Sequence, residues 1–342
     1  MSDDTRPNGG AHCDVIVVGA GMAGLTAAHA LVDADRTVII LDKGRSVGGR
    51  LATRRMAGAR LDHGAQFFTV RTPAFAARVA DWERRGLAHV WCHGFGAGSG
   101  DTTSPSATAA GDGHPRWVGT FGMNALAKDL ATGLDVRVDH RVFSTERTDD
   151  VWTVTCDDAS TFTADALVLT APVAQSFSMV FETVEDLPRA VFDADYDRTL
   201  GLLAVLDRPS AVPAPGGVQR PSPEIAWVAD NAAKGISEVP ALTVHASPDW
   251  SEQHWDTPED EVHALLLELS AGWIGDATVV DSQVKRWRFA TPRHPWPDEC
   301  WVSQEHRLVL AGDAFAGPRV EGAHTSGLVA ATTVTELLSA DR

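Results

Sequence analysis

Three glycines and an aspartate near the start of the chain have the types and the spacing of a phosphate-binding site. Gly19, Gly21 and Gly24 form Gly-x-Gly-x-x-Gly, and Asp42 follows 18 residues after the last glycine. The first glycine of this motif allows a tight turn, the second lets the backbone approach a pyrophosphate, and the third lets a helix pack closely on a strand. A carboxylate at the position of Asp42 can accept hydrogen bonds from a ribose diol. The chemistry expected here is the binding of a dinucleotide.

The segments around these residues predict the elements that must hold them. The apolar residues 15–18 predict a buried strand before the glycine turn, and the apolar pattern of 25–31 predicts a helix after it. A second apolar run, 38–41, predicts the strand that ends at Asp42. Together these segments form one βαβ unit. The N-terminus of its helix offers free N–H groups and the positive end of the helix dipole to the phosphates.

A second set of motifs lies after this unit and at the end of the chain. Gly48-Gly49-Arg50 and Gly64-Ala65-Gln66-Phe67 follow the first unit. Much later, the apolar run 308–311 predicts a strand that ends in Gly312-Asp313. The segment Val320-Glu321-Gly322 then leads into a run of small residues that predicts a C-terminal helix.

The order of these motifs resembles the FAD-dependent amine oxidase superfamily, and within it the renalase-type group. The segments that carry the resemblance to this group are 64–69, 116–126, 285–290 and 319–323. The resemblance spans residues 14–335, although Pro318 stands where the family often has a glycine. It implies FAD as the cofactor, and because no residue is marked for a covalent link we expect noncovalent attachment.

The resemblance extends the glycine motif to a larger set of cofactor residues. It assigns Arg50 and the backbone of Gly49 to the pyrophosphate, and Asp313 to the ribityl chain or the pyrophosphate. The N–H groups near Val320 are expected to face N1 and the C2 carbonyl of the flavin, where negative charge develops on reduction. The full predicted set is Gly19, Gly21, Met22, Ala23, Gly24, Asp42, Lys43, Gly49, Arg50, Leu51, Gly64, Ala65, Gln66, Phe67, Gly312, Asp313, Val320 and Glu321.

The substrate side is predicted from fewer signals. The candidate catalytic residues are Gln66, Trp287 and His324, and the candidate substrate residues are Phe67, Arg116, Phe121, Asn124, Arg286 and Arg288, with His245 as a further pocket candidate. Core packing is the alternative for Trp287, and an ordinary polar helix position is the alternative for His324. Lys285 invites comparison with the lysine–water pair of amine oxidases, but its surroundings favour an exposed strand lysine.

The composition excludes several classes of partner. The chain has 342 residues, 44% of them hydrophobic, which suits a globular protein of two domains. Its net charge is −17. The negative charge argues against nucleic acid and anionic membranes. No apolar run reaches the roughly 18 residues that a membrane span requires. The four cysteines are widely spaced and form no C-x-x-C, so we expect a reduced, cytoplasmic chain without a metal site.

The fold class expected is α/β, with α+β character in an inserted part. A Rossmann-type FAD-binding domain would comprise 14–75, 134–175 and 300–340, and a substrate domain with a mixed or antiparallel sheet plus helices would comprise 76–133 and 176–299. Residues 1–13 are expected to be a flexible tail. We also predict helices over 75–91, 122–132 and from Thr257 to 272, with Thr257 as N-cap. The polar segment 94–114 is expected to be a disordered loop or a lid.

The function expected is that of an FAD-dependent oxidase. The resemblance implies that the substrates are the 2- and 6-dihydro isomers of NAD(P)H, which give a hydride to flavin N5, with dioxygen as the final acceptor and hydrogen peroxide as the product. Two alternatives stay open. One is a flavin amine oxidase or a desaturase that acts on a pathway metabolite, and the other is a flavin-bound redox sensor or assembly partner without turnover.

Overall fold

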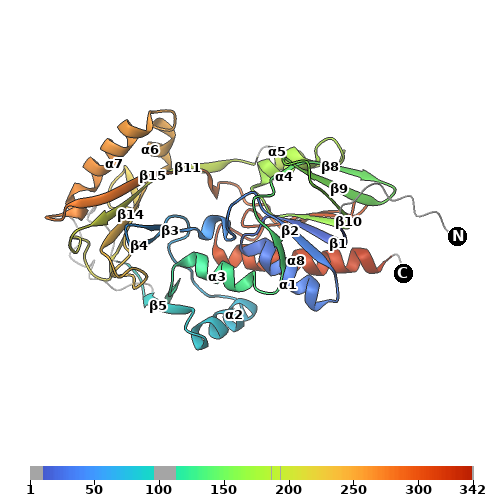
Figure 1. Cartoon of the computed structure of the whole chain (residues 1–342), viewed down its shortest axis with the longest axis horizontal. Helices are drawn as coiled ribbons and strands as arrows, with labels where there is room; N and C mark the ends of the chain where they lie inside the picture. Colours follow the sequence, from blue (N-terminus) through green and yellow to red (C-terminus); the bar gives the residue numbers. More distant parts are fainter. Residues whose placement is uncertain (1–10, 96–112, 186, 193, 341–342) are drawn as a thin grey trace. The chain divides into compact units, whose positions relative to one another are not determined.

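The computed structural model describes residues 11–95, 113–185, 187–192 and 194–340 and separates them into two compact units (Figure 1). Unit 1 consists of residues 1–49, 130–194 and 294–342, and unit 2 of residues 50–129 and 195–293. Residues 50–75, which we assigned from the sequence to the cofactor domain, lie in unit 2, and residues 176–194 lie in unit 1. Each unit is therefore assembled from segments that are far apart in the sequence.

Unit 1 is built on an eight-stranded sheet with a parallel centre, in the order β16-β17-β10-β1-β2-β7. The first half of β10 also pairs with β9, which pairs with β8, and both of these contacts are antiparallel. Residues 15–18 are all buried, as expected for a parallel strand that is covered on both faces. The strands are β1 (His12–Val18), β2 (Val38–Leu41), β7 (Asp135–Arg137), β8 (Val142–Thr148), β9 (Val151–Cys156), β10 (Thr161–Leu169), β16 (Trp301–Ser303) and β17 (Leu308–Leu310).

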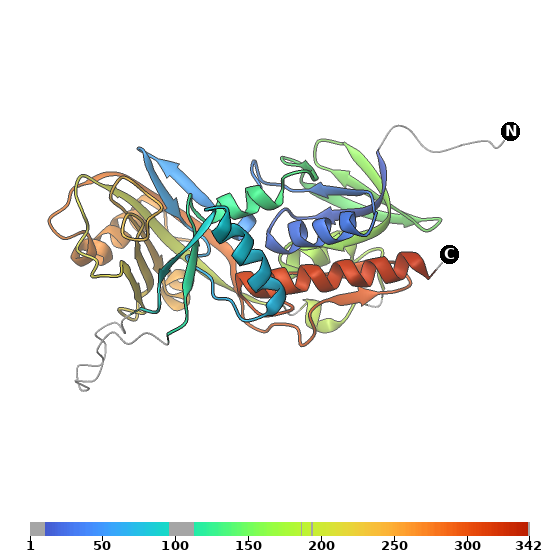
Figure 2. The same ribbon diagram turned by 90° about the horizontal axis from the view of Figure 1, so that it is seen from below.

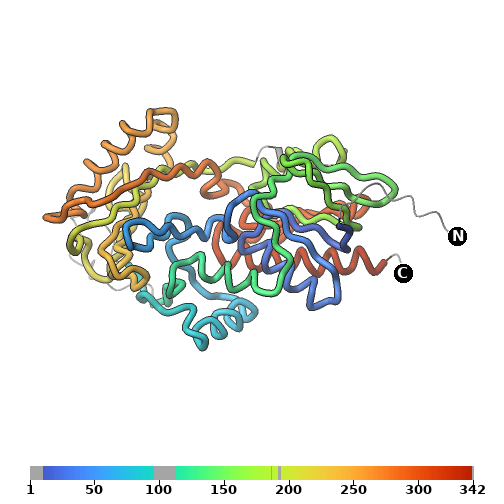
Figure 3. The backbone as a smooth tube through the Cα atoms, viewed as in Figure 1, coloured from blue at the N-terminus to red at the C-terminus, as the bar shows by residue number. Residues whose placement is uncertain are grey.

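Helices α1 (Met22–Asp33) and α8 (Val320–Ser339) lie side by side in unit 1 and contact its sheet (Figures 2 and 3). Their contact needs a glycine, because a Cβ atom on Gly327 would lie 2.3 Å from the carbonyl oxygen of Ala23. Unit 1 also contains α4 (Val173–Val180) and α5 (Arg189–Phe192). The two ends of the chain thus meet in one layer, which confirms the Rossmann-type fold predicted from both.

Unit 2 is built on a five-stranded antiparallel sheet, in the order β12-β13-β14-β11-β15. Two hairpins, β3–β4 and β5–β6, complete its strands. The bounds are β3 (Thr53–Met56), β4 (Ala59–Asp62), β5 (Ala88–Cys92), β6 (Arg116–Gly119), β11 (Tyr196–Leu206), β12 (Gly217–Gln219), β13 (Ile225–Asp230), β14 (Ala241–Ala246) and β15 (Val279–Pro292). Its helices are α2 (Pro73–Arg84), α3 (Met123–Leu130), α6 (Pro248–Gln253) and α7 (Glu259–Ile274).

The alternation of side chains along β11 divides the core of unit 2 in two. Leu200, Leu202 and Ala204 point to the face that α6 and α7 cover. Leu203 and Val205 point to the other face, where they pack with residues of β4. Because successive residues of a strand face opposite sides of a sheet, one apolar run fills both layers. The sheet is thereby fixed against the β3–β4 hairpin, which leads directly into the segment that begins at Asp62.

Three expectations about local structure are wrong. The helix predicted to continue to residue 91 ends at Arg84, because the chain turns at Gly86, whose φ is +69°, and continues as β5. Helix α7 begins at Glu259, and its N-cap is Pro258 without a side-chain hydrogen bond, so Thr257 does not cap it. The predicted tail of residues 1–13 is too long, because β1 begins at His12.

Most of the segment 94–114, predicted as a loop, lies outside the described residues. Within the part of the chain that the structure describes, no helix combines the length and the apolar character that crossing a membrane would demand.

Candidate functional site

The glycine turn of unit 1 is shaped by contacts that only glycine allows. Gly19 has φ +109°, in the region that favours glycine, and it follows β1 directly. A Cβ atom on Gly24 would lie 1.9 Å from the carbonyl oxygen of Gly19, which backbone atoms cannot accommodate. The first and third glycines therefore hold the start of α1 tightly against the turn that leads into it.

Gly21, unlike Gly19 and Gly24, is not closely packed, and the space beside it shows whether a dinucleotide fits. A Cβ atom on Gly21 would meet nothing within 4 Å, so the start of α1 opens on free space. The second glycine segment borders this space: Gly48 N–H donates to the carbonyl oxygen of Ala20 at 2.8 Å, and a Cβ on Gly49 would come 3.8 Å from Gly21 Cα. Two strips of backbone without side chains therefore lie side by side, as a pyrophosphate cradle requires.

Asp42 stands at the end of β2, but its carboxylate already has structural partners. Oδ2 accepts a hydrogen bond from Ala20 N at 2.6 Å, and Oδ1 accepts one from Gly44 N at 2.7 Å. Each oxygen retains a second lone pair, so it can still accept a hydrogen bond from a ribose hydroxyl. This contact with the ribose stays a prediction. Lys43, also predicted for the cofactor, donates to Gln175 Oε1 at 2.9 Å. Asp42 thus fixes the glycine turn itself, a role that the motif alone does not indicate.

The C-terminal motif is held together by Ser326. Its hydroxyl accepts from Gly312 N at 2.8 Å and donates to the carbonyl oxygen of Glu299 at 2.6 Å, which ties α8 to the turn after β17. Helix α8 starts at Val320, so the segment that we expected to precede the helix forms its first turn, and the N-cap residue makes no side-chain capping bond. The contact of Asp313 with the ribityl chain or the pyrophosphate stays a prediction. His324 is buried in the same helix, at 4% exposure.

In unit 2 the turn after Asp62 is packed against Arg50. A Cβ atom on Gly64 would lie 2.0 Å from the carbonyl oxygen of Arg50, and Ala65 N donates to the same oxygen at 2.8 Å. Arg50 itself directs Nη1 to the carbonyl oxygen of Ala290 at 3.4 Å. The Gly-Gly-Arg and Gly-Ala-Gln segments, separate motifs in the sequence, are therefore one local structure.

The carbonyl oxygen of His63 joins three of the residues in this turn region. Trp287 donates its indole N–H to this oxygen at 2.6 Å, and His245 Nε2 approaches it at 3.2 Å. The indole also stacks on the imidazole of His63, with ring centroids 5.3 Å apart and an interplanar angle of 26°. Because a carbonyl can only accept, His245 is protonated on Nε2. The sequence singled out Trp287 and His245 but missed His63, which lies between them.

Both histidines are neutral over the physiological range. Burial, with smaller contributions from Lys285, His245 and Arg54, lowers the pKa of His63 to about 3. Burial, opposed by the contact to the His63 backbone and assisted by Lys234, lowers the pKa of His245 to about 4. Burial and Arg54 also lower the pKa of Lys285, and Glu259 opposes them. The charged groups that affect the turn around His63 are thus mainly positive. The imidazoles of His63 and His245 can donate and accept hydrogen bonds but carry no charge.

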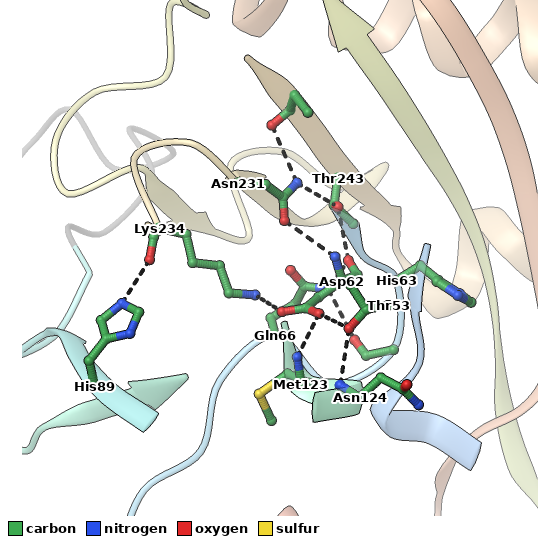
Figure 4. A network of polar contacts seen from close by, with 12 residues as sticks. Thr53, Asp62, His63, Gln66, His89, Met123, Asn124, Asn231, Lys234 and Thr243 are labelled. Carbon is green, nitrogen blue, oxygen red and sulfur yellow. Dashed lines mark hydrogen bonds and ion pairs between the residues drawn. The ribbon is translucent and has the colours of Figure 1, made fainter. Parts of the chain in front are cut away.

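Asp62, at the start of the turn, carries a buried ion pair that the sequence did not reveal (Figure 4). Lys234 Nζ lies 2.7 Å from Asp62 Oδ2, and both side chains have no exposed surface. The other carboxylate oxygen accepts from Thr53 Oγ1 at 2.5 Å and from Met123 N at 2.9 Å. Both carboxylate oxygens are therefore engaged by groups of unit 2. The only signal for it was an acid beside the Gly-Ala-Gln motif, and nothing pointed to a lysine 172 residues away.

Phe67 is part of an aromatic cluster. Its ring lies 5.1 Å from Phe95 and 5.6 Å from Trp227, and the guanidinium of Arg116 lies 5.5 Å from its centroid. Trp91 completes the cluster, 4.9 Å from Phe95. The structure thus brings together Phe67 and Arg116, two residues predicted for the substrate, through a cation–π contact.

The remaining predicted substrate residues have other surroundings. Arg286 donates to the carbonyl oxygens of Trp255 and, at 2.8 Å, Thr257, on the side of β15 opposite Trp287. Arg288 is exposed, and Phe121 is 51% exposed. Asn124 lies at the start of α3, where its N–H donates to Thr53 Oγ1 at 3.0 Å. Arg286 thus holds the loop before α7, and its contact with the substrate stays a prediction.

Comparison with known protein families assigns most of the chain. A profile described as flavin containing amine oxidoreductase matches residues 100–335, and a profile described as NAD(P)-binding Rossmann-like domain matches residues 17–81. The first match covers more than half of the chain. The second contains the glycine turn, Asp42 and the Gly-Ala-Gln segment.

Similar curated proteins match over short stretches. A putrescine oxidase from Kocuria rosea is 50% identical over 56 residues, which are 16% of this chain and 12% of the relative. A polyamine oxidase 1 from Oryza sativa subsp. japonica is 40% identical over 91 residues, 24% of this chain and 18% of the relative. These alignments cover less than a fifth of either relative. They do not decide whether the chain lies in the renalase-type group, which stays a prediction.

Solved structures show the same fold over nearly the whole chain. A putrescine oxidase bound to putrescine superposes with a TM-score of 0.70 at 16% identity, covering 95% of this chain and 99% of the other. The cyclohexylamine oxidase from Brevibacterium oxydans IH-35A superposes with a TM-score of 0.66 at 14% identity, covering 96% and 99%. At this level of identity the similarity establishes the fold alone.

Proposed function

The chain belongs to the flavin-containing amine oxidoreductases and its cofactor is FAD; from this premise we propose that it is an oxidase of reduced nicotinamide dinucleotides. The proposed substrates are the 2- and 6-dihydro isomers of NAD(P)H. FAD supplies the hydride acceptor, and dioxygen takes the electrons on to hydrogen peroxide. NAD(P)+ is the other product. We also propose noncovalent attachment of FAD, because no residue of the sequence is marked for a covalent link.

The observation that supports this substrate class is the charge around the His63 turn. Besides burial, the positive charges of Lys285 and Arg54 lower the pKa of His63. At Lys285, the negative charge of Glu259 opposes the effect of burial and Arg54 on the pKa. The only carboxylate of the turn, Asp62, is paired with Lys234. An ammonium substrate needs a nearby carboxylate or an electron-rich face to replace its water shell. A substrate with a neutral ring and anionic phosphates avoids this penalty.

The residues of the turn then have defined tasks. Trp287 and Phe67 offer flat apolar surfaces against which a ring can stack. Stacking restricts which ring carbon faces the hydride acceptor, and a displacement of about 1 Å can cost on the order of a hundredfold in rate. His63 and His245 are neutral, so they can orient polar groups of the substrate but do not act as acids near neutral pH.

The second candidate is oxidation of a primary amine or a polyamine. The names of the relatives favour it, since a putrescine oxidase and a polyamine oxidase are among the curated proteins that match part of the chain. An aromatic pair such as Phe67 and Trp227 can also bind a cation through its ring faces. The two candidates make opposite demands on the charge of the substrate.

A steady-state assay separates the two candidates. The holoenzyme is incubated in air with a borohydride-reduced NAD+ preparation, with purified 1,4-dihydro NADH, or with putrescine and spermidine, and both NAD+ and hydrogen peroxide are measured. We expect equal amounts of NAD+ and peroxide from the mixed isomers and little from the 1,4-isomer. Peroxide from the amines, with none from the isomers, would establish the second candidate.

A further inference from the structure

The carboxamide of Gln66 is held in one orientation by its own turn. Nε2 donates to the carbonyl oxygen of Asp62 at 2.7 Å and to that of Gly64 at 3.1 Å. Rotating the amide by a half-turn would place Oε1 against these two oxygens, neither of which can donate. Both amide hydrogens are therefore used inside the turn, and Oε1 is left as a pure acceptor.

This acceptor is buried and has no protein partner. The side chain of Gln66 is 7% exposed, and among the residues that the structure describes none donates to Oε1. Native proteins leave few buried polar atoms unsatisfied, and each one that remains needs an explanation, such as a catalytic role or a bound water or ion. Phe67, which follows directly in the chain, belongs to the aromatic cluster. The unsatisfied oxygen and the ring that we assign to stacking are thus carried by consecutive residues of one turn.

The Gln66 amide is bonded to the residue that forms the buried pair with Lys234. The Asp62 backbone oxygen, which receives the Gln66 amide, also accepts from Thr243 Oγ1 at 2.9 Å. Its carboxylate is fixed by Lys234 from one side and by Thr53 from the other (Figure 4). Residues of β3, β14 and the turn after β13 thereby converge on Asp62. Removing one member of a buried pair leaves an uncompensated charge, which displaces its surroundings.

We propose that the buried Asp62–Lys234 pair is a positioning device that sets Gln66 Oε1 to accept a hydrogen bond from an N–H group of a bound ligand. Two groups implied by the proposed function, on which this inference rests, carry such an N–H. One is N3–H of the flavin, and the other is the carboxamide NH2 of a nicotinamide. The donor chemistry is the same for both, and the experiment distinguishes them.

The first experiment uses Gln66→Met in the FAD-loaded protein, with Gln219→Met, an exposed residue of β12, as the matched control. Flavin absorption is recorded without substrate, and the flavin bands are then titrated with NAD+ and with 3-acetylpyridine adenine dinucleotide, which carries a methyl group in place of the amide nitrogen. If the flavin is the donor, the bands shift without any ligand. If the nicotinamide is the donor, NAD+ binds about threefold to tenfold more weakly and the acetyl analogue is unaffected.

The second experiment tests the pair. Lys234→Met should lose the same preference for NAD+ over the acetyl analogue, or shift the same flavin bands, and adding Gln66→Met should then change nothing further. Asp62→Asn combined with Lys234→Met removes both charges and guards against a failure to fold. A merely structural pair would lower the melting temperature but leave the preference and the flavin spectrum intact.

The outcomes separate this inference from the proposed function. If neither dinucleotide binds but the flavin bands respond to Gln66→Met and Lys234→Met, the nicotinamide proposal fails and the acceptor role stands. If the enzyme oxidises dihydronicotinamides while the Gln66 variant matches the Gln219 control in both spectrum and preference, the acceptor role is overturned. Additive effects of Gln66→Met and Lys234→Met would overturn the positioning role of the pair.

Discussion

Trp287 donates its indole N–H to the carbonyl oxygen of His63 at 2.6 Å while its ring stacks on the imidazole of the same residue. This double contact joins β15 to the turn that carries Gln66. Trp287→Phe keeps an aromatic ring but removes the donor, so we expect the free energy of unfolding to fall by about 1 kcal/mol. Trp287→Ala should cost more, because the stacking is lost as well. Urea unfolding of the two variants measures both effects, and a Trp287→Phe protein as stable as the wild type would contradict the role of the bond.

The stability of the protein should depend on pH through two histidines. The pKa of His63 is lowered from 6.5 to about 3 and that of His245 to about 4, so both bind protons in the unfolded chain before they do so in the folded one. Their contribution is complete above pH 6.5 and is lost as the pH falls towards 4 and below, by about 1.4 kcal/mol per pH unit for each histidine. Urea midpoints between pH 7 and pH 4.5 should show this slope, and His245→Gln should reduce it. An equal slope in the variant would show that His245 titrates normally.

Replacing two glycines of the cradle should impair different properties, FAD binding in one case and stability in the other. Gly21→Val adds atoms to open space, so we expect a folded protein that has lost FAD. Gly24→Ala places a Cβ atom 1.9 Å from the carbonyl oxygen of Gly19, and we expect a loss of about 1–3 kcal/mol or more of stability as the start of α1 moves. Thermal unfolding and FAD titration of both variants separate the two effects. Normal FAD affinity in Gly21→Val would mean that the pyrophosphate lies elsewhere.

Arg286 and Arg288 flank Trp287 in the sequence, but replacing them should have different effects on the protein. Arg286 holds the carbonyl oxygens of Trp255 and Thr257, so Arg286→Ala should lower the free energy of unfolding by about 1–3 kcal/mol. Arg288 is exposed, and Arg288→Ala should change stability by less than about 0.5 kcal/mol. If Arg288 binds a substrate phosphate, its variant should raise KM with little change in kcat. A stable Arg286→Ala protein with a raised KM would restore the substrate role predicted from the sequence.

Elements that follow from a continuous local pattern were predictable. The apolar run 38–41 is β2 with the predicted bounds, because a parallel strand that is buried on both faces needs an unbroken apolar run. The extended helix prediction for 75–91 failed although Gly86 was visible, since the apolar spacing continued beyond it. Helix α7 was found from its pattern, but the capping residue was misjudged because proline itself occupies the N-cap.

The candidate site was predictable only where a motif marks it. The glycine turn and the Gly-Ala-Gln segment have fixed spacing, so their residues were named in advance. The Asp62–Lys234 pair joins residues 172 positions apart, and single-sequence periodicity contains no information about such a contact. The hydrogen bonds of Arg286 could not be predicted for the same reason. Their acceptors lie in the loop before α7, and Thr257 is 29 residues away from Arg286 in the sequence. Long-range polar contacts therefore account for most of what was missed.

Reduction of the flavin in the absence of oxygen distinguishes a dihydronicotinamide from an amine as the electron donor. The oxidised holoenzyme is mixed in a stopped-flow instrument with separated 2-, 4- and 6-dihydro isomers of NADH and, in parallel, with putrescine and benzylamine. We predict rapid bleaching of the flavin by the 2- or 6-isomer, slow or absent bleaching by the 4-isomer, and an unchanged flavin with both amines. Bleaching by an amine within seconds, with no response to any of the three isomers, would rule out a dihydronicotinamide donor and establish an amine oxidase.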